Sequence, residues 1–308
     1  MGKISVVTTA YNELETIPEL YKRLKSVLVA TGKNYEIIFV DDASSDGSTG
    51  LLKSIASKDK DVKVIVLSRN FGQHSAVAAG FKHCSGDIVI WMDADLQDVP
   101  ENIPMFISKI EEGYDIVYGV PESRGDPFYK KIGAKLVFAL FEKLSGCKLP
   151  KGGVSTLRAL KREVVEAFNV LPEHSRFTAG MIAWLGFSYS VIPVKHEERK
   201  KGRSKYGLLK LSQLSLNAII SFSDYPLKIL SNIGIGLSLL SVSIGAFMVY
   251  RKLTAGFVIS GYASLIVSIF FLFGLQFFFM GILGEYIARV FKDVQGRPVY
   301  VIKEKINL

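Results

Sequence analysis

Short apolar runs rich in β-branched residues alternate with longer amphipathic segments through the first 120 residues of the chain. The short runs have the length and composition of buried strands, and the longer segments place their apolar residues at helical spacing. Strands are therefore predicted at residues 4–9, 35–40, 62–67, 88–92 and 115–119, with helices ending near residues 30 and 83. Because strand and helix alternate, a mostly parallel α/β sheet with helices on both faces is expected.

The pattern becomes less regular after residue 120. Helical spacing predicts helices at residues 128–144, 164–170 and 177–185, and strands are predicted at residues 189–193 and 297–302. Residues 208–222 carry one polar stripe on an otherwise apolar helix. That arrangement favours a helix lying in a membrane interface, although a core helix would show a similar pattern.

Two long apolar stretches follow, at residues 226–250 and 257–284. Each is longer than the roughly 20 residues that cross a bilayer core of about 30 Å. The chain is therefore divided into a catalytic domain at 1–205, an interfacial helix at 206–224, two transmembrane helices within 225–290 and a C-terminal tail at 291–308. Two buried core helices are the less favoured alternative at these lengths.

Composition supports a membrane protein. The net charge is +9 and the isoelectric point about 9.3, yet the mean hydropathy is positive at +0.27. The flanks at 195–210 and 289–305 carry many more Lys and Arg than the connector with Arg251 and Lys252. The positive-inside rule therefore places the catalytic domain and both termini in the cytoplasm. Nucleic-acid binding, the competing explanation of the charge, is not expected.

The cysteines and the N-terminal segment suggest no further functional site. Cys84 and Cys147 stand outside any metal-ligand spacing, so we expect reduced thiols of a cytosolic domain. The N-terminus runs directly into a predicted strand, and no signal peptide is expected.

Two carboxylates, Asp93 and Asp95, end the predicted strand at 88–92. Residues i and i+2 share a face of an extended chain, so both side chains can approach one point beyond the carboxyl end of the strand. Ligands of open α/β sheets bind there, and a carboxylate pair suits Mg²⁺ or Mn²⁺ together with substrate phosphates. The alternative is that Asp95 caps the next helix and Asp93 is a solvated turn residue.

Common nucleotide-binding motifs are absent from the strand ends. The turn after the first strand, Thr8-Thr9-Ala10-Tyr11-Asn12, has no glycine, so it does not match the dinucleotide fingerprint. The chain also has no glycine-rich loop ending in Gly-Lys-Ser or Gly-Lys-Thr. A dehydrogenase and a P-loop ATPase are therefore excluded.

Four turns together resemble glycosyltransferase family 2, the inverting enzymes with the Rossmann-like GT-A fold. They are Val7-Thr8-Thr9-Ala10-Tyr11-Asn12-Glu13, Val40-Asp41-Asp42-Ala43-Ser44-Ser45-Asp46-Gly47-Ser48, Ser68-Arg69-Asn70-Phe71-Gly72 and Asp93-Ala94-Asp95-Leu96-Gln97. The resemblance implies a nucleotide-sugar site built from Thr9, Tyr11, Glu13, Asp42, Arg69, Asp93, Ala94 and Asp95. It also implies catalytic roles for Asp93, Asp95 and Gln97, with a divalent metal, Mg²⁺ or Mn²⁺, on Asp95 and Asp93.

The second half is similar to the polyisoprenyl-phosphate branch of that family. His196-x-Glu198-Arg199-Lys200-x-Gly202-x-Ser204-Lys205-Tyr206 resembles the loop by which those enzymes meet a lipid phosphate. The branch includes bactoprenol glucosyltransferases, undecaprenyl-phosphate 4-deoxy-4-formamido-L-arabinose transferases and dolichol-phosphate mannose synthases. The implied lipid-phosphate ligands are Arg158, Arg199, Arg203, Ser204 and Lys205. A solvated loop, or the cytoplasmic flank of a membrane span, is the alternative explanation of this basic run.

The resemblance implies transfer of a sugar from a UDP-sugar onto undecaprenyl phosphate for the cell envelope. The implied partners are the nucleotide sugar, polyprenyl phosphate, the bilayer of the inner membrane and further copies of the chain in a tetramer. Two positions depart from the family: Thr156 replaces an acidic residue, and Pro121 replaces an arginine. A processive polysaccharide synthase and a catalytically impaired nucleotide-sugar-binding scaffold are the alternatives.

Overall fold

The computed structural model describes residues 2–121, 150, 154–173, 177–194, 225–255 and 261–308. The chain separates into two compact units, one made of Met1–Ala218 with Arg297–Leu308 and the other of Ile219–Gly296. The helix predicted at 128–144 and the interfacial helix predicted at 206–224 lie outside the described residues.

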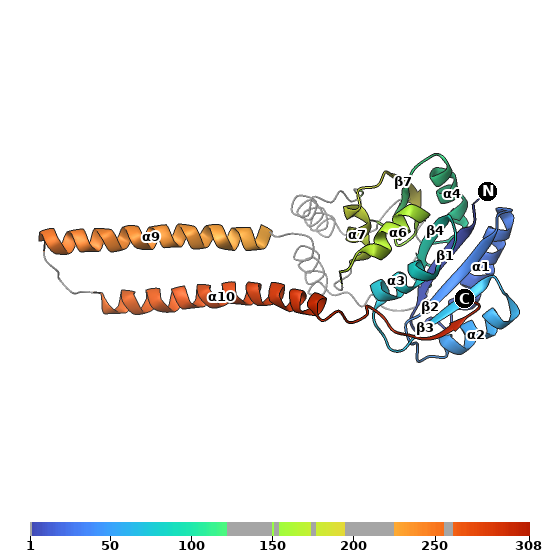
Figure 1. Ribbon diagram of the computed structural model, residues 1–308, viewed down its shortest axis with the longest axis horizontal. Helices are drawn as coiled ribbons and strands as arrows, with labels where there is room; N and C mark the ends of the chain where they lie inside the picture. The colour runs from blue at the N-terminus through green and yellow to red at the C-terminus, as the bar shows by residue number, and fades with distance from the viewer. Residues whose placement is uncertain (1, 122–149, 151–153, 174–176, 195–224, 256–260) are drawn as a thin grey trace. The chain divides into compact units, whose positions relative to one another are not determined.

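The first unit contains an eight-stranded sheet in the order β7-β5-β6-β4-β1-β2-β3-β8 (Figure 1). Its centre consists of four parallel strands, β4, β1, β2 and β3, which confirms the mostly parallel α/β fold. The strands are β1 (Ile4–Ala10), β2 (Tyr35–Asp41), β3 (Val62–Leu67), β4 (Ile88–Asp93), β5 (Ile116–Pro121), β6 (Arg158–Lys161), β7 (Tyr189–Val194) and β8 (Ile302–Ile306). The central strands are buried on both faces, which explains their continuous apolar runs.

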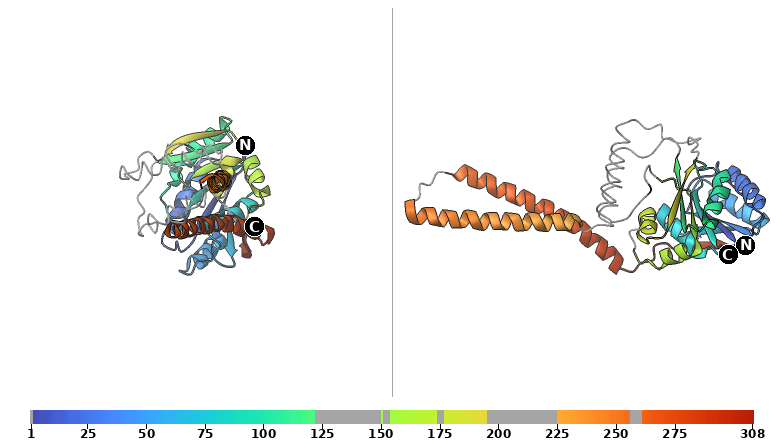
Figure 2. Two further views of the ribbon diagram at one scale, coloured as in Figure 1. Left: turned by 90° about the vertical axis from the view of Figure 1, so that its left-hand side faces the viewer. Right: turned by 90° about the horizontal axis from the view of Figure 1, so that it is seen from above.

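Helices cover both faces of this sheet (Figure 2). The first layer includes α1 (Ile17–Ala30), α2 (Ser48–Lys58), the 3₁₀ turn η1 (Pro100–Asn102) and α4 (Ile103–Glu111). The second includes α3 (Gln73–His83), α6 (Arg162–Val170) and α7 (Thr178–Trp184). Helix α1 shows how periodicity directs packing, because its buried residues Ile17, Leu20, Leu24 and Leu28 form one stripe.

Two strands differ from the sequence-based prediction. Strand β6 was not predicted, and it runs antiparallel between β4 and β5. Its four residues include an Arg and a Lys, so no apolar pattern marks it. The terminal strand predicted at 297–302 was wrong, because β8 occupies Ile302–Ile306, where the alternation of Ile, Lys and Glu fits an edge strand.

The second unit consists of α9 (Tyr225–Ala255) and α10 (Tyr262–Val294). Each contains an apolar window long enough to cross a membrane, Leu227–Ile244 and Ser268–Val294. Helix α10 continues about ten residues beyond the predicted apolar stretch, through a turn in which Arg289 pairs with Glu285 at 3.7 Å. Length and composition therefore allow two membrane crossings.

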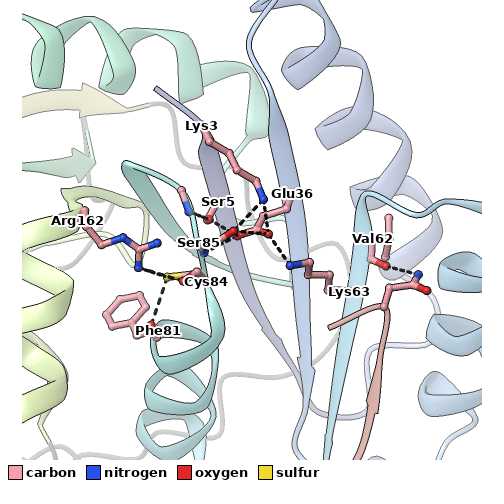
Figure 3. A network of polar contacts seen from close by, with 11 residues as sticks. Lys3, Ser5, Glu36, Val62, Lys63, Phe81, Cys84, Ser85 and Arg162 are labelled. Carbon is pink, nitrogen blue, oxygen red and sulfur yellow. Dashed lines mark hydrogen bonds and ion pairs between the residues drawn. The ribbon is translucent and has the colours of Figure 1, made fainter. Parts of the chain in front are cut away.

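A buried carboxylate crosslinks the amino-terminal ends of the central strands (Figure 3). Glu36 in β2 accepts ion-pair contacts from Lys3 at 2.9 Å and Lys63 at 2.8 Å, and hydrogen bonds from Ser5 and from the Ser85 N–H. Burial alone would raise the pKa of Glu36, but these contacts together lower it to about 2. The network therefore stabilises the fold only while Glu36 is ionised.

Replacing Glu36 with Gln is expected to destabilise the protein at neutral pH and to have little effect at pH 2. The folded pKa lies below the ordinary value of 4.5, so the stabilisation is complete above pH 4.5 and is lost as the pH falls toward 2. A pKa change of this size corresponds to about 3 kcal/mol. Thermal unfolding of the detergent-solubilised protein across this pH range measures the effect.

Glu112→Gln provides the control, because Glu112 pairs with Lys109 on the surface, where an ion pair contributes about 0–1 kcal/mol. A Glu36→Gln protein as stable as the Glu112→Gln protein at pH 7 would contradict the prediction.

Candidate functional site

The carboxyl ends of β1, β2 and β4 meet at one edge of the sheet. Parallel register places Thr9 opposite Asp93 and Ala10 opposite Asp41. The Thr9 hydroxyl donates to Asp93 Oδ1 at 3.3 Å, and Gln73 Nε2 donates to the same oxygen at 2.6 Å. The end of β1 and the start of α3 therefore both contact the first carboxylate of the pair.

Asp93 lies in an environment that disfavours its negative charge. Burial and, to a smaller extent, the neighbouring carboxylates of Asp95 and Asp98 raise the pKa of Asp93 to about 6, and the hydrogen bonds from Gln73 and Thr9 only partly oppose this rise. A cation placed between the carboxylates would relieve this repulsion. Oxygen donors in such a pair fit Mg²⁺ or Mn²⁺.

Asp95 lies in the turn after β4. Its Oδ1 accepts the Gln97 N–H at 3.1 Å, as in an Asx turn, while the side chain stays partly exposed. Between them, Leu96 adopts a left-handed backbone with φ 60° and buries its side chain to 4% exposure. Ala94 is buried as well, so the turn is anchored by apolar side chains while Asp95 and Gln97 remain partly accessible.

Left-handed backbone also occurs in the turns after β1 and β2, at Asn12 (φ 58°) and Ala43 (φ 59°). The two turns bind each other, because Asn12 N–H donates to Ser44 Oγ and the Ser45 N–H donates to Asn12 Oδ1, both at 2.9 Å. Asn tolerates this region better than most residues, whereas a residue such as Ala43 pays an energetic cost there, and such strained positions cluster at functional sites.

Asp42 holds the loop between β3 and α3. Its carboxylate accepts the Phe71 N–H at 2.7 Å and the Gly72 N–H at 2.8 Å, and only 3% of the residue is exposed. Burial raises the pKa of Asp42, opposed by these two bonds. In the same loop, the Arg69 guanidinium lies over the Phe71 ring, 4.3 Å from its centroid. Asp42 therefore positions the segment that presents Arg69.

Tyr11 and Glu13 follow β1 and border the same edge. Tyr11 is 47% exposed. Glu13 is partly buried, accepts the Thr16 hydroxyl at 2.9 Å and donates its N–H to Ser48 Oγ at 3.1 Å. These contacts join the β1 turn to the start of α2.

Arg158 lies deeper than expected for a lipid-phosphate ligand. It is 3% exposed, and its guanidinium lies 4.3 Å from the Trp91 ring centroid. Its N–H groups reach the Ser155 carbonyl at 3.2 Å and, less closely, the Thr156 carbonyl at 3.4 Å. The side chain therefore supports the turn before β6, and burial lowers the pKa of Arg158 while nearby groups, including the Asp93 carboxylate, partly oppose this.

The same turn is held from its other side by Asp98. Asp98 Oδ2 accepts the Ser155 hydroxyl at 2.5 Å, the Thr156 hydroxyl at 2.8 Å and the Leu157 N–H at 3.0 Å. Thr156, which replaces the acidic residue of the family pattern, thus donates a hydrogen bond to the Asp98 carboxylate. The Thr156 hydroxyl therefore helps to hold the 155–157 turn against Asp98.

Four predicted ligands, Arg199, Arg203, Ser204 and Lys205, lie outside the described residues. Within the described part of the chain, no group of three or more His, Cys, Asp or Glu side chains is arranged to hold a metal. A metal at Asp93 and Asp95 would therefore take its remaining ligands from substrate phosphates and water, as Mg²⁺ commonly does.

Gln73 and Asp98 contribute to the site without having been assigned a role from sequence. Both stand inside recognisable motifs, Gln73 directly after Phe71-Gly72 and Asp98 directly after Gln97. Their roles depend on partners 20 and 57–59 positions away, at Asp93 and in the 155–157 turn. The sequence could have indicated these two residues only by their position beside the motifs. Their contacts could be identified only in the folded structure.

The comparisons with known proteins agree with this geometry. The profile of the family described as "Glycosyl transferase family 2" matches residues 5–168. The uncharacterized glycosyltransferase sll0501 of Synechocystis sp. is 38% identical over 303 residues, covering 98% of this chain and 95% of its own.

Two solved structures share the fold at lower identity. A mannosyltransferase from Pyrobaculum calidifontis, in complex with GDP-mannose and Mn²⁺, is 19% identical with a TM-score of 0.51, over 95% of this chain and 87% of that one. Glucosyl-3-phosphoglycerate synthase from Mycobacterium tuberculosis, in complex with Mn²⁺, UDP and phosphoglyceric acid, is 21% identical with a TM-score of 0.52, over 71% and 76%.

The family profile covers more than half of the chain, and the Synechocystis relative matches nearly all of it. The matched residues contain β1, β2, β3 and β4 with the turns that bring Asp42, Asp93 and Asp95 to one edge of the sheet. The chain belongs to glycosyl transferase family 2 and is a glycosyltransferase.

Proposed function

We propose that this glycosyltransferase moves a sugar from a nucleotide sugar, UDP-linked, onto polyprenyl phosphate at the cytoplasmic face of the cell membrane. The catalytic domain is residues 1–205, the interfacial helix 206–224, the membrane hairpin 225–290 and the cytoplasmic tail 291–308. The observation that carries the proposal is the carboxylate pair Asp93 and Asp95 in a chain that also contains two helices of membrane length.

The nucleotide sugar is proposed to bind at the edge of the sheet where the carboxyl ends of β1, β2 and β4 meet. Thr9, Tyr11, Glu13 and Asp42 border the nucleotide, with Asp42 acting through the loop that it holds. Asp93, Ala94 and Asp95 face the diphosphate, Arg69 lies at its side, and Gln97 is near the sugar. A divalent metal held by Asp95 and Asp93 would offset charge on the departing diphosphate. Mn²⁺ in the two structural neighbours is consistent with that metal.

The acceptor proposal rests on chemistry that needs no strong base. A phosphate oxygen forms a bond to C1 of the sugar while the bond from C1 to the nucleoside diphosphate breaks. The second pKa of a phosphate monoester is about 6, so this oxygen is already largely ionised at neutral pH. The Thr156 hydroxyl, which is bonded to Asp98, is therefore compatible with activity. Arg199, Arg203, Ser204 and Lys205 are proposed to hold the acceptor phosphate.

Strand β8 supports the membrane arrangement. It follows both apolar helices in sequence and pairs with β3 in the catalytic sheet. The chain therefore returns after α10 to the side on which the sheet lies, which favours two crossings over one. A catalytic domain tethered in this way meets acceptors that reside in the membrane.

Product analysis tests the function. Membranes containing the protein are incubated with undecaprenyl phosphate and labelled UDP-sugars or GDP-sugars, and lipid products are separated by thin-layer chromatography. One labelled lipid carrying a single sugar is expected. A ladder of longer products would indicate a processive synthase instead. Nucleotide binding without any product from a panel of donors would indicate a binding scaffold.

The membrane topology makes a separate prediction. A reporter fused to either terminus is expected to read cytoplasmic, and one inserted between Lys252 and Thr254 is expected to read external, because the flanks outside the hairpin carry most of the positive charge. A reporter inserted at Gly113, in an exposed loop of the catalytic domain, serves as the cytoplasmic control. An external C-terminus would contradict the two-span arrangement.

A further inference from the structure

The C-terminal strand β8 forms an irregular edge of the catalytic sheet. It pairs antiparallel with β3, matching Val66 with Glu304 but Leu67 with Ile302. Lys303 is therefore an extra residue, a β-bulge at the carboxyl end of β3. Bulges bend a strand locally and occur often beside active sites, where they redirect the chain that follows.

The opposite end of β8 is firmly held. The Asn307 side-chain amide donates to the Ala56 carbonyl at 2.7 Å and to the Val62 carbonyl at 2.8 Å. Glu304 pairs with Lys53 at 2.5 Å, and Ile306 packs against the hydrophobic core. The irregularity is thus confined to the end of β8 that lies next to the loop after β3.

This end of β8 connects directly to the candidate donor site. The Ser68 N–H donates to the Val301 carbonyl at 2.9 Å. Ser68 opens the loop whose Phe71 and Gly72 N–H groups bind Asp42, and the next residue, Gln73, donates to Asp93. Only the short segment 68–73 separates the contact with β8 from the contact with Asp93.

Regular antiparallel pairing would align the loop differently. With Val66 opposite Glu304, an unbulged strand would place Leu67 opposite Lys303 and Ser68 opposite Ile302. The bulge shifts this alignment by one residue, so that the Val301 carbonyl meets the Ser68 N–H. A one-residue shift also reverses the face toward which a strand residue points.

We propose that the bulge at Lys303 positions the Ser68–Gly72 loop for the nucleotide diphosphate of the donor. Residues 301–303 are thereby positioning residues of the donor site, although they lie at the opposite end of the chain from the family motifs. The inference rests on the proposed function and adds that the donor site is completed by chain that follows the second apolar helix.

Deletion of Lys303 from the full-length protein tests the proposal, with Lys303→Ala as the matched control that keeps the bulge and removes only an exposed side chain. UDP and GDP are titrated in the presence of Mn²⁺ by calorimetry in detergent. The deletion is expected to weaken nucleotide binding by about tenfold or more, the effect of one lost hydrogen bond to a charged group. Lys303→Ala is expected to bind within about twofold of the wild type.

The variant Asn307→Ala tests whether an effect on nucleotide binding comes from the bulge itself or from a general weakening of the contacts of β8. It removes the contacts at the distant end and is expected to lower the melting temperature while leaving nucleotide affinity unchanged. Faster amide exchange across residues 68–72 in the Lys303 deletion, with no such change in Lys303→Ala, would locate the effect in the loop. If the deletion does not fold, a glycine inserted after Lys303 enlarges the bulge and is expected to weaken binding similarly.

Nucleotide affinity unchanged in the deletion, or in the insertion where only that variant folds, would overturn the inference. So would an equal loss of affinity in Asn307→Ala. Failure of the wild type to bind either nucleotide with Mn²⁺ would instead overturn the proposed function, and the two failures are therefore distinguishable.

Discussion

Replacing Asp95 with Asn is expected to reduce sugar transfer by at least about two orders of magnitude while leaving the protein folded and inserted. The amide keeps an oxygen that can accept the Gln97 N–H, so the turn after β4 is retained. What is lost is one negative charge opposite the donor diphosphate. A metal interaction at a developing charge contributes several kcal/mol, and each loss of about 1.4 kcal/mol is tenfold in rate.

Steady-state transfer assays and Mn²⁺-dependent UDP binding measure the effect of Asp95→Asn. Asp61→Asn is the matched control, since it removes the same charge from an exposed position at the opposite end of the sheet. Unchanged transfer in Asp95→Asn would refute the metal role, as would wild-type activity that persists in EDTA.

Replacing Arg203 with Gln is expected to raise the apparent KM for polyprenyl phosphate by roughly ten- to a hundredfold and to leave the KM for the nucleotide sugar nearly unchanged. One charge-assisted hydrogen bond contributes about 1.5–3 kcal/mol, which gives this range at about 1.4 kcal/mol per decade. Arginine suits this role because its planar guanidinium can bind a phosphate through two hydrogen bonds.

Kinetics of purified Arg203→Gln in detergent, varying each substrate in turn, measure the effect. Lys201→Gln removes a charge from the same basic run without touching a proposed phosphate ligand, and it is expected to behave like the wild type. Equal losses for both substrates would indicate a general defect. Unchanged KM values for both substrates would indicate that this basic run is only a solvated flank of the membrane span.

Local sequence features were sufficient to predict the centre of the fold and the position of the carboxylate pair in the candidate site. The apolar runs that form β1 to β4 differ from their predicted bounds by one residue at most. Asp93 ends β4 and Asp95 lies in the turn that follows, so both carboxylates stand at the carboxyl end of this central strand. Strand periodicity, helix periodicity and apolar length are properties of neighbouring residues, and they are readable without the fold.

Other features depend on residues that are distant in the chain, so only the tertiary structure decided them. The resemblance predicts Arg158 as a lipid-phosphate ligand, whereas pairing of β6 with β4 places Arg158 opposite Trp91 and buries its guanidinium against that ring. Glu36 has an ordinary sequence context, and its pKa is lowered by Lys63 on β3 and by Lys3, which directly precedes β1. Strand β8 joins the sheet 235 positions beyond Leu67 in the Leu67–Ile302 pair, because pairing needs a free strand edge rather than a nearby sequence.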